Sequence, residues 1–481
     1  MATINTNDLR IQNANNLIEL LQAGNSYVSL GRVEAWPDDN APPVPQNNNK
    51  DYYSLWDQTF ILNEIELDNV FNMLPKRTWE SGVVYDRYQQ NYSLENKSFS
   101  GATNIYDCNF FVLTSTNSVY VCLNNNNNAE SVVEPSVVDN ESFFFTSDGY
   151  QWLRLFDIST ENLRNKSTNN LIPLIPQNIN TLPIQGEIYT VVINDGGTGY
   201  TNNPSGVNQL LHYYAKISGD GSGAVAKVSV SNGAITEVVV TRPGVGYTYA
   251  ELIFEAGKVY ATEGELDLGI NGLNPLGNNN LRTTVVIPPP NGWGSNPARE
   301  LGGTRVGVFD EPDVSLFPGS FRQIGIITNP TIKTGKVGDI ITCSAIKLTS
   351  DSIPAGNTYV IGETIEQQRE IGGVIKRAKG TVISFENDII FYIQTPSDVD
   401  TDGELVAFGG DTTIKGLTTD LVGTVDRTET GTGVYDTLDF SSGYARGNAD
   451  AYTGFLNYVT NLSPVTLSTD EQKRITLVIS F

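Results

Sequence analysis

The sequence predicts a mainly β protein of several domains, an α+β chain with little helix, built from sandwich-like or barrel-like units with inserted β modules. Nearly every apolar stretch is short and rich in Val, Ile, Thr, Tyr and Phe, the residue types that strands favour. Gly, Asn, Asp or Pro bound these stretches, as is typical of turns. The length of 481 residues exceeds what one hydrophobic core usually supports, so roughly two to four domains are expected.

A short helix near the N-terminus is the expected exception. In residues 13–22, Leu and Ile recur on one helical face, and Ala23-Gly24 is suited to ending the helix. Prolines in residues 41–49 lack backbone donors, so this stretch is expected to cross the surface as an extended loop. The asparagine run 124–128 is expected at a loop tip.

A hairpin is predicted from residues 110–113 and 118–121, with the turn at 114–117. It would bring Cys108 near Cys122. With Cys343 as the third cysteine, the chain has too few for a disulfide framework or a structural zinc site. A reduced, partly buried pair is preferred over a disulfide, because a cytoplasmic compartment is expected.

The clearest internal signal is a repeat. Residues 186–201 return as residues 233–248, with an offset of 47 residues between Tyr200 and Tyr247. In each copy a β-branched strand enters a Gly-x-Gly turn, whose glycines permit positive φ, and the following tyrosine can fold its ring over the strand. Because free-standing repeat folds need about three units, two copies predict one compact inserted module.

A second β-rich insertion is expected further along. Its strand candidates are Tyr359–Ile365, Gly380–Phe385 and Asp388–Ile393. The predicted organisation is a region at 1–185, the repeat module at 186–310, a return to the first region at 311–345, the second insertion at 346–430 and a C-terminal segment at 431–481.

Charge excludes some classes of partner. The chain has 54 Asp and Glu against 30 Lys and Arg, a net charge of −24. Such a surplus repels nucleic-acid phosphates and anionic membrane surfaces within a Debye length. Neither an apolar run of membrane-spanning length nor a signal-peptide pattern is found. No nucleic-acid or membrane partner is therefore expected.

Signals for catalysis are weak. His212 is the single histidine, so any nucleophile–histidine mechanism would depend on it, yet no Gly-x-Ser-x-Gly motif or reactive-cysteine signature accompanies it. Gly219–Gly223 lacks the Lys-Ser or Lys-Thr of a phosphate-binding loop and is explained as a turn. No enzyme, catalytic residue or cofactor is predicted.

One weak metal candidate remains. Asp398, Asp400 and Asp402, followed by Gly403, match the opening half of a calcium loop, but the twelfth position is Gly409 rather than the bidentate glutamate. An acidic turn is the preferred interpretation.

Aromatic clusters at 51–56, 85–88 and 150–152 combine rings with Arg or Asp, as interface hot spots do. Core packing is the alternative, and no single residue is assigned to a contact.

Five separated segments carry a family resemblance: Tyr27–Trp36, Leu74–Trp79, Asp148–Phe156, Phe321–Pro330 and Ile475–Phe481. Their order and spacing resemble the baseplate wedge protein, gene product eight, of T-even-type contractile-tailed bacteriophages. The likeness covers residues 7–173, 317–330 and 454–481. The middle of the chain departs from the family pattern.

The resemblance implies a structural protein of the virion tail baseplate, assembled in the host cytoplasm. It implies a homodimer that bridges other baseplate wedge subunits and reorganises with them as rigid bodies during tail contraction. The alternative is a receptor-binding or carbohydrate-binding tail fibre or adhesin, motivated by the acidic, aromatic, β-rich character and the Gly-Tyr repeats. Such a protein would usually be a trimer.

Overall fold

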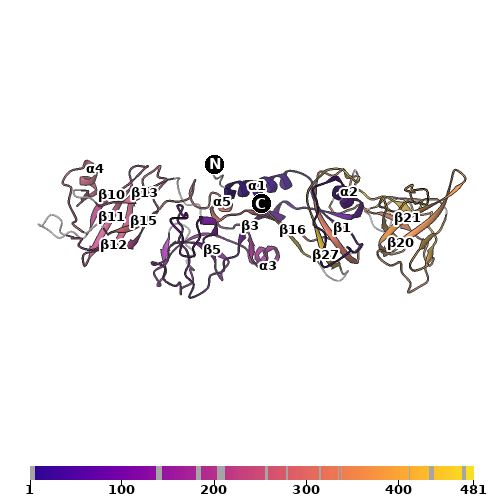
Figure 1. Ribbon diagram of the computed structural model, residues 1–481, viewed down its shortest axis with the longest axis horizontal. Coiled ribbons are helices and arrows are strands. Elements are labelled where there is room, and N and C mark those ends of the chain that lie inside the picture. The colour runs from indigo at the N-terminus through magenta and orange to yellow at the C-terminus, as the bar shows by residue number, and fades with distance from the viewer. Residues whose placement is uncertain are drawn as a thin grey trace. The chain divides into compact units, whose positions relative to one another are not determined.

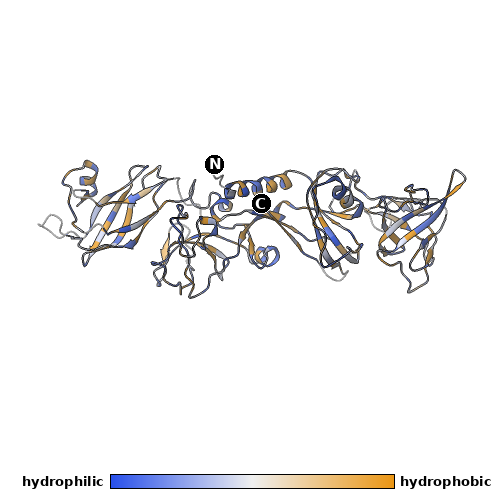
Figure 2. Cartoon of the chain, viewed as in Figure 1, coloured by the Kyte–Doolittle hydropathy of each residue, from blue (hydrophilic) through white to orange (hydrophobic). Residues whose placement is uncertain are grey.

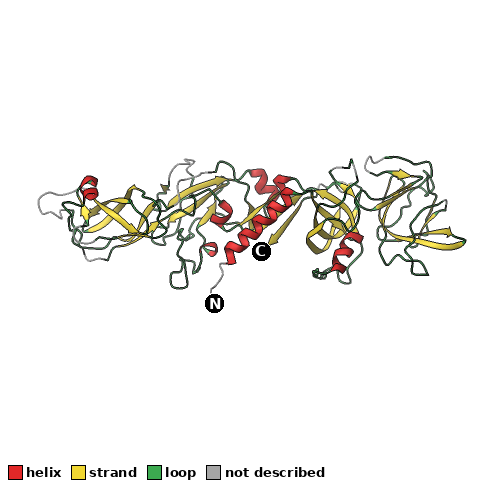
Figure 3. Ribbon diagram, turned by 90° about the horizontal axis from the view of Figure 1, so that it is seen from above, coloured by secondary structure: helices red, strands yellow, loops and turns green. Residues whose placement is uncertain are grey.

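The computed structural model describes the chain in twelve stretches (Figure 1): 6–136, 143–179, 186–202, 212–254, 258–277, 280–313, 316–333, 335–336, 338–410, 412–432, 438–467 and 473–481. Strands form 39% of the structure and helices 12%. Figure 3 shows the same predominance of strands. The prediction of a mainly β, multidomain fold with little helix is therefore confirmed.

The chain folds into two compact units, each assembled from separate segments. The first unit contains residues 1–15, 72–306 and 479–481, and the second contains 16–71 and 307–478. The chain passes from one to the other within α1 (Thr6–Ala23), β3 (Val70–Pro75), β16 (Arg305–Asp310) and β28 (Ile475–Ser480). With β8 (Leu171–Pro173), these three strands form a sheet in the order β28-β16-β3-β8.

Helix α1 contains the predicted 13–22 helix and extends it toward the N-terminus. Its buried residues include Ile11, Ala14 and Leu21, a spacing of three to seven residues that places them on one helical face. Figure 2 shows the matching change between hydrophobic and hydrophilic residues along this helix. The buried stripe explains why this segment is helical rather than a strand.

The second unit contains a five-stranded sheet in the order β18-β2-β1-β17-β27. The strands are β18 (Ile340–Ile341), β2 (Thr59–Glu64), β1 (Ser26–Gly31), β17 (Gly319–Thr328) and β27 (Phe455–Leu467). Helix α2 (Asn49–Gln58) begins after the N-cap Asn48, whose side chain accepts a hydrogen bond from Asp51 N. Leu55 and Trp56 of α2 pack into a core cluster with residues of the sheet.

The first unit contains a four-stranded sheet in the order β4-β5-β7-β6. The strands are β4 (Phe111–Leu113), β5 (Ser118–Asn124), β7 (Gln151–Asp157) and β6 (Phe144–Phe145). Strands β4 and β5 pair antiparallel, with Phe111 opposite Val121, which confirms the predicted hairpin. The short helical segments of the first unit include η2 (Ile105–Asp107), α3 (Thr160–Lys166) and α5 (Pro297–Leu301), whereas η1 (Leu67–Asn69) belongs to the second unit.

The repeat region forms its own sheets within the first unit. One has the order β12-β11-β10-β13, with β14 also paired to β10, and a two-stranded ribbon joins β15 to β9. The elements are β9 (Thr190–Asp195), β10 (Tyr213–Gly219), β11 (Val225–Ser231), β12 (Ala234–Arg242), β13 (Ala250–Leu252), β14 (Val259–Tyr260), α4 (Glu263–Leu268) and β15 (Arg282–Val286).

The two copies of the repeat make matched contacts with each other. Tyr200 N donates to Gly233 O (2.9 Å), and Tyr247 N donates to Gly186 O (3.0 Å). A second matched pair of backbone bonds joins the copies: Ile235 N to Gly196 O (3.0 Å) and Ile188 N to Pro243 O (2.9 Å). The two copies of the repeat are therefore joined by reciprocal backbone hydrogen bonds.

The Gly-x-Gly turns adopt the conformation that the sequence predicts. Gly197, Gly199, Gly244 and Gly246 all have positive φ, which a side chain would disfavour. Both tyrosines that follow are buried, and the Tyr247 hydroxyl donates to Ile217 O (3.2 Å). The turns therefore serve to fold these rings back into the module's core.

The second β-rich region forms an eight-stranded sheet in the order β24-β23-β20-β21-β22-β19-β26-β25. The strands are β19 (Ser344–Lys347), β20 (Thr364–Ile371), β21 (Val374–Glu386), β22 (Ile389–Ile393), β23 (Ile414–Gly416), β24 (Val422–Gly423), β25 (Phe440–Ser441) and β26 (Tyr444–Ala445). The predicted strands 380–385 and 388–393 correspond to parts of β21 and to β22.

The strand predicted at Tyr359–Ile365 is wrong for most of its length, because β20 begins only at Thr364. Tyr359 lies in the preceding loop, where it is buried, and its hydroxyl donates to Ile414 O (3.1 Å). A ring that enters the core from a loop has the same apolar character as a strand residue, so composition alone did not distinguish them.

Candidate functional site

Two of the five segments that carry the sequence resemblance, 27–36 and 321–330, meet in the five-stranded sheet of the second unit. Strand β1 pairs antiparallel with β17 over its whole length, from Ser26 opposite Thr328 to Gly31 opposite Gln323. All six residues of β1 are buried. These two segments, far apart in the sequence, therefore form adjacent central strands.

Charged and aromatic side chains fix the loop that follows β1. The Arg322 guanidinium donates from Nε and Nη2 to the two carboxylate oxygens of Asp39, both at 2.9 Å, a bidentate arrangement that lowers the pKa of Asp39. The Arg32 guanidinium lies 3.8 Å from the centroid of the Trp36 ring. Trp36 Nε1 donates to Leu462 O (3.0 Å), so this loop is held against β27.

In the first unit the resembling segments contribute to the core. The Arg77 guanidinium lies 4.5 Å from the Phe111 ring centroid, and burial lowers the pKa of Arg77 to about 10. Trp152 is fully buried and stacks on Tyr150, with ring centroids 5.4 Å apart. Tyr85 meets Trp152 edge-on. The aromatic clusters at 85–88 and 150–152 are thus core, whereas Tyr53 of the 51–56 cluster is 49% exposed.

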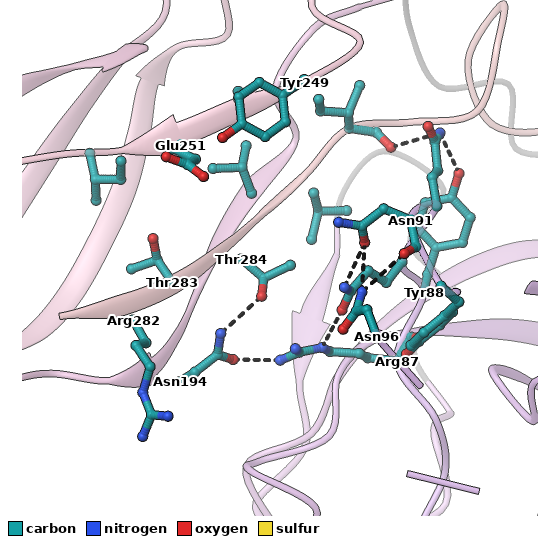
Figure 4. Close-up of a pocket in the computed structure, with 18 of the residues that line it drawn as sticks. Arg87, Tyr88, Asn91, Asn96, Asn194, Tyr249, Glu251, Arg282, Thr283 and Thr284 are labelled. Atoms are coloured by element: carbon teal, nitrogen blue, oxygen red, sulfur yellow. Dashed lines mark hydrogen bonds between the residues drawn. The ribbon is translucent and has the colours of Figure 1, made fainter. Parts of the chain in front are cut away.

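A pocket of about 1450 Å³ lies within the first unit (Figure 4). One wall is the segment 87–99 with nearby asparagines, and the other belongs to the repeat module. The lining residues are 87–92, 96–99, Asn125, Asn127, Asn128, Asn194, Tyr200, 248–254 and 281–287. This pocket brings together residues up to 200 positions apart in the sequence.

A continuous hydrogen-bond network links the two walls. The Arg87 guanidinium donates from Nη1 to Asn194 Oδ1 and from Nε to Gln89 Oε1 (3.2 Å). Asn194 Nδ2 then donates to Thr284 Oγ1 (2.9 Å), and Gln89 Nε2 donates to Asn91 Oδ1 (2.6 Å). Figure 4 shows Arg87 between Asn194 and the amide side chains. The polar groups are therefore held in fixed positions by one another.

Tyr249, on the module side, is placed by a carboxylate. The N–H groups of Thr248 and Tyr249 both donate to Asp220 Oδ1 at 2.9 Å, and the Thr248 hydroxyl donates to Asp220 Oδ2. These bonds hold the pKa of Asp220 at about 2. The turn that presents the Tyr249 ring, which is 54% exposed, is thus fixed by an ionised side chain.

The weak calcium candidate is an acidic turn in the structure. Asp398 accepts hydrogen bonds from the N–H and the hydroxyl of Thr395 (2.7 and 3.0 Å). Asp400 Oδ1 accepts from the N–H groups of Asp402 and Glu404 (2.9 and 3.1 Å). These carboxylates are used to close the turn, and the described residues contain no group of three or more His, Cys, Asp or Glu suited to a metal ion.

The single histidine and the three cysteines lie in surroundings that suit packing. His212 is half-buried and meets the Tyr214 ring edge-on, with centroids 5.4 Å apart. Cys108, Cys122 and Cys343 are all buried free thiols, and burial raises the pKa of Cys108 to about 12. Since a nucleophilic cysteine needs a lowered pKa, this environment suits a packing role. Among the described helices, none is long and apolar enough to cross a membrane.

The pocket is the feature that sequence reasoning missed. The repeat and the 85–88 cluster are each recognisable in the sequence, but the residues that meet here come from five separate stretches of the chain. The surplus of amide side chains in residues 89–96 and 124–128 was the only local signal, and it is equally typical of loops.

No protein-family model matches the chain, and no curated protein matches it.

Proposed function

We propose that this protein is a structural subunit of a contractile phage tail baseplate wedge, which dimerises and bridges neighbouring wedge proteins. The observation that most supports this proposal is the pairing of β1 with β17. These strands contain two of the segments on which the resemblance rests, and they lie side by side in one sheet. Their adjacency supports the proposal, because it brings two of the resembling segments into one structural element.

The parts outside the resemblance support the same interpretation. Residues 190–286 and 344–445 supply the strands of sheets that are distinct from the β1–β17 sheet, and each region has its own hydrophobic cluster. Insertions with their own cores can be added to a fold without rebuilding it. The departures from the family pattern are therefore compatible with a retained wedge fold.

The first test is genetic. A nonsense codon replacing Trp36 in the phage genome should yield lysates without complete baseplates on a non-suppressing host, and a plasmid copy of the gene should restore them. Electron microscopy of the lysates gives the readout. Particles with complete baseplates that fail only in adsorption would contradict the proposal and favour a receptor-binding protein.

The second test is the mass of the purified protein by light scattering. A dimer should have about twice the chain mass of 52.4 kDa and should persist on dilution. A trimer would contradict the wedge-dimer proposal.

A further inference from the structure

We propose that the pocket of the first unit binds an oligosaccharide, with acidic saccharides preferred. This goes beyond the proposed function, since a wedge subunit needs only protein partners. The site is defined by two walls, the segment 87–99 and the repeat module, and by the hydrogen-bond network that joins them.

The lining has the chemistry that sugar hydroxyls require. Eight of its side chains are amides: Gln89, Gln90, Asn91, Asn96, Asn125, Asn127, Asn128 and Asn194. An amide both donates and accepts hydrogen bonds, as a sugar hydroxyl does. The bonds among Arg87, Gln89, Asn91 and Asn194 fix several of these groups in advance, which lowers the entropic cost of binding.

Two rings supply apolar surface at the same site. Tyr249 is 54% exposed and Phe99 is 57% exposed, and both line the pocket. Single exposed rings are common on proteins, but here they stand among amides, and Asp220 holds the backbone of Tyr249. An aromatic face beside fixed hydrogen-bonding groups matches a sugar ring, which has an apolar C–H face and a polar rim.

The size of the pocket indicates more than one sugar residue. Sites for drug-sized ligands are roughly 300–1,000 Å³, whereas this pocket is about 1450 Å³. A single sugar ring would leave most of the network without contact, so the fitting ligand is an oligomer.

The local charge indicates the preferred class of saccharide. Arg87, Lys97 and Arg282 line the pocket, against the carboxylate of Glu251. Asp195, outside the lining, also pairs with Arg282 (Oδ2 to Nη2, 3.3 Å), which leaves a small positive balance. The chain as a whole has the opposite balance, with a net charge of −24. A cationic pocket in an acidic protein favours a ligand with carboxylate or other anionic groups, most strongly at low ionic strength.

An extended peptide is the rival occupant, because β13 and β15 at the pocket are paired on one side only, with β10 and β9. A strand inserted between them would require a separation of roughly 9.5 Å, twice the normal strand spacing. Cα atoms of β13 and β15 lie within 8 Å of each other. The gap between these strands is therefore too narrow for strand addition.

The test uses the purified full-length protein and ligand-observed saturation-transfer NMR. The probes are hexagalacturonate as the acidic saccharide, maltohexaose as the neutral one, and a panel of purified bacterial surface oligosaccharides. At least one acidic saccharide should receive saturation, and calorimetry should show its affinity falling as salt is raised. No saturation transfer to any saccharide would overturn the proposal, as would competition for the site by extended peptides alone.

Matched variants place the binding in the pocket. Tyr249→Ala and Arg282→Ala should each weaken binding by at least about tenfold, as loss of a central contact does. Tyr53→Ala and Arg377→Ala are the controls, because Tyr53 is 49% exposed and the Arg377 side chain is 50% exposed and neither lines the pocket. Equal affinities for pocket and control variants would overturn the assignment. All four residues are about half exposed or more, so the variants should fold, which circular dichroism would verify.

Discussion

The carboxyl group of Asp310 lies in the interior of the second unit. It is 6% exposed, and Asn63 Nδ2 donates to its Oδ2 (3.2 Å). Burial raises the pKa of Asp310 to about 7, and the nearby carboxylates of Asp339 and Glu311 add to the rise. The folded chain therefore holds this proton more tightly than the unfolded chain, where an aspartate has a pKa near 3.9.

The raised pKa of Asp310 makes the stability of the folded chain depend on pH. The stabilising contribution of Asp310 is complete below about pH 4 and is lost as the pH rises through about 7. Asp310→Asn keeps an oxygen that can accept from Asn63 but cannot ionise. The variant's melting temperature, relative to the natural protein, should therefore increase between pH 4 and pH 8. Calorimetric scans at pH 4, 6 and 8 test this, and a difference that does not change with pH would contradict it.

At the scale of elements, helix α2 and the sheet beneath it approach closely at one glycine. A Cβ added to Gly325, in β17, would lie 2.7 Å from Leu55 Cδ1 of α2 and 2.6 Å from Ser29 Oγ of β1. Such distances force neighbouring atoms to move. Close packing between α2, β1 and β17 therefore explains why a glycine occupies this position of the Phe321–Pro330 segment.

Gly325→Ala should lower the free energy of unfolding by about 1–3 kcal/mol, the usual cost of overpacking a core. The matched control is Gly264→Ala in α4, where an added Cβ meets nothing within 4 Å. Since alanine favours helix over glycine by about 1 kcal/mol, the control should be neutral or slightly stabilising. Denaturant unfolding curves measure both, and equal stabilities would contradict the packing argument.

The predictability of these elements from sequence depends on how local their signals are. The 111–121 hairpin and the repeat glycines were predicted because turn chemistry and strand composition lie within a few residues. Tyr359 was misassigned because a buried ring in a loop has the composition of a strand. The pocket was not predicted at all, because Arg87, Asn194 and Tyr249 meet only through tertiary packing.

At the scale of the whole molecule, the two units are interleaved along the chain. The first unit contains residues near both termini, and the second begins at residue 16 and ends at 478. Neither unit corresponds to a single continuous stretch. A truncation at almost any position therefore removes part of both units. Only an internal segment whose two ends lie close together can be removed without this effect.

The eight-stranded sheet is a part that can be removed, because the chain segments that enter and leave it lie next to each other. Asn448 N donates to Ile341 O (2.7 Å), and a Cβ added to Gly447 would lie 2.0 Å from Thr342 O. Replacing residues 343–446 with Gly-Gly should therefore leave a protein that folds cooperatively with the same oligomeric mass. Its melting temperature should fall modestly, because Phe317 loses its edge contact with the Phe391 ring (centroids 5.4 Å apart).

Circular dichroism, thermal melts and light scattering measure the outcome of this excision. Removal of residues 72–175, which include most of β3 and all of β5 and β7, is the control and should abolish folding. An insoluble product from the 343–446 excision, with soluble parent protein, would contradict the prediction.

The matched hydrogen bonds of the repeat module have a further consequence. Tyr200 to Gly233 and Tyr247 to Gly186 are the same contact made in opposite directions, as two identical chains make across a twofold axis. The two copies of the repeat therefore pair as equivalent segments of a homodimer do, but within one polypeptide. Tethering replaces a concentration-dependent association with an intramolecular one, so each copy of the 16-residue repeat finds its partner 47 residues away in its own chain.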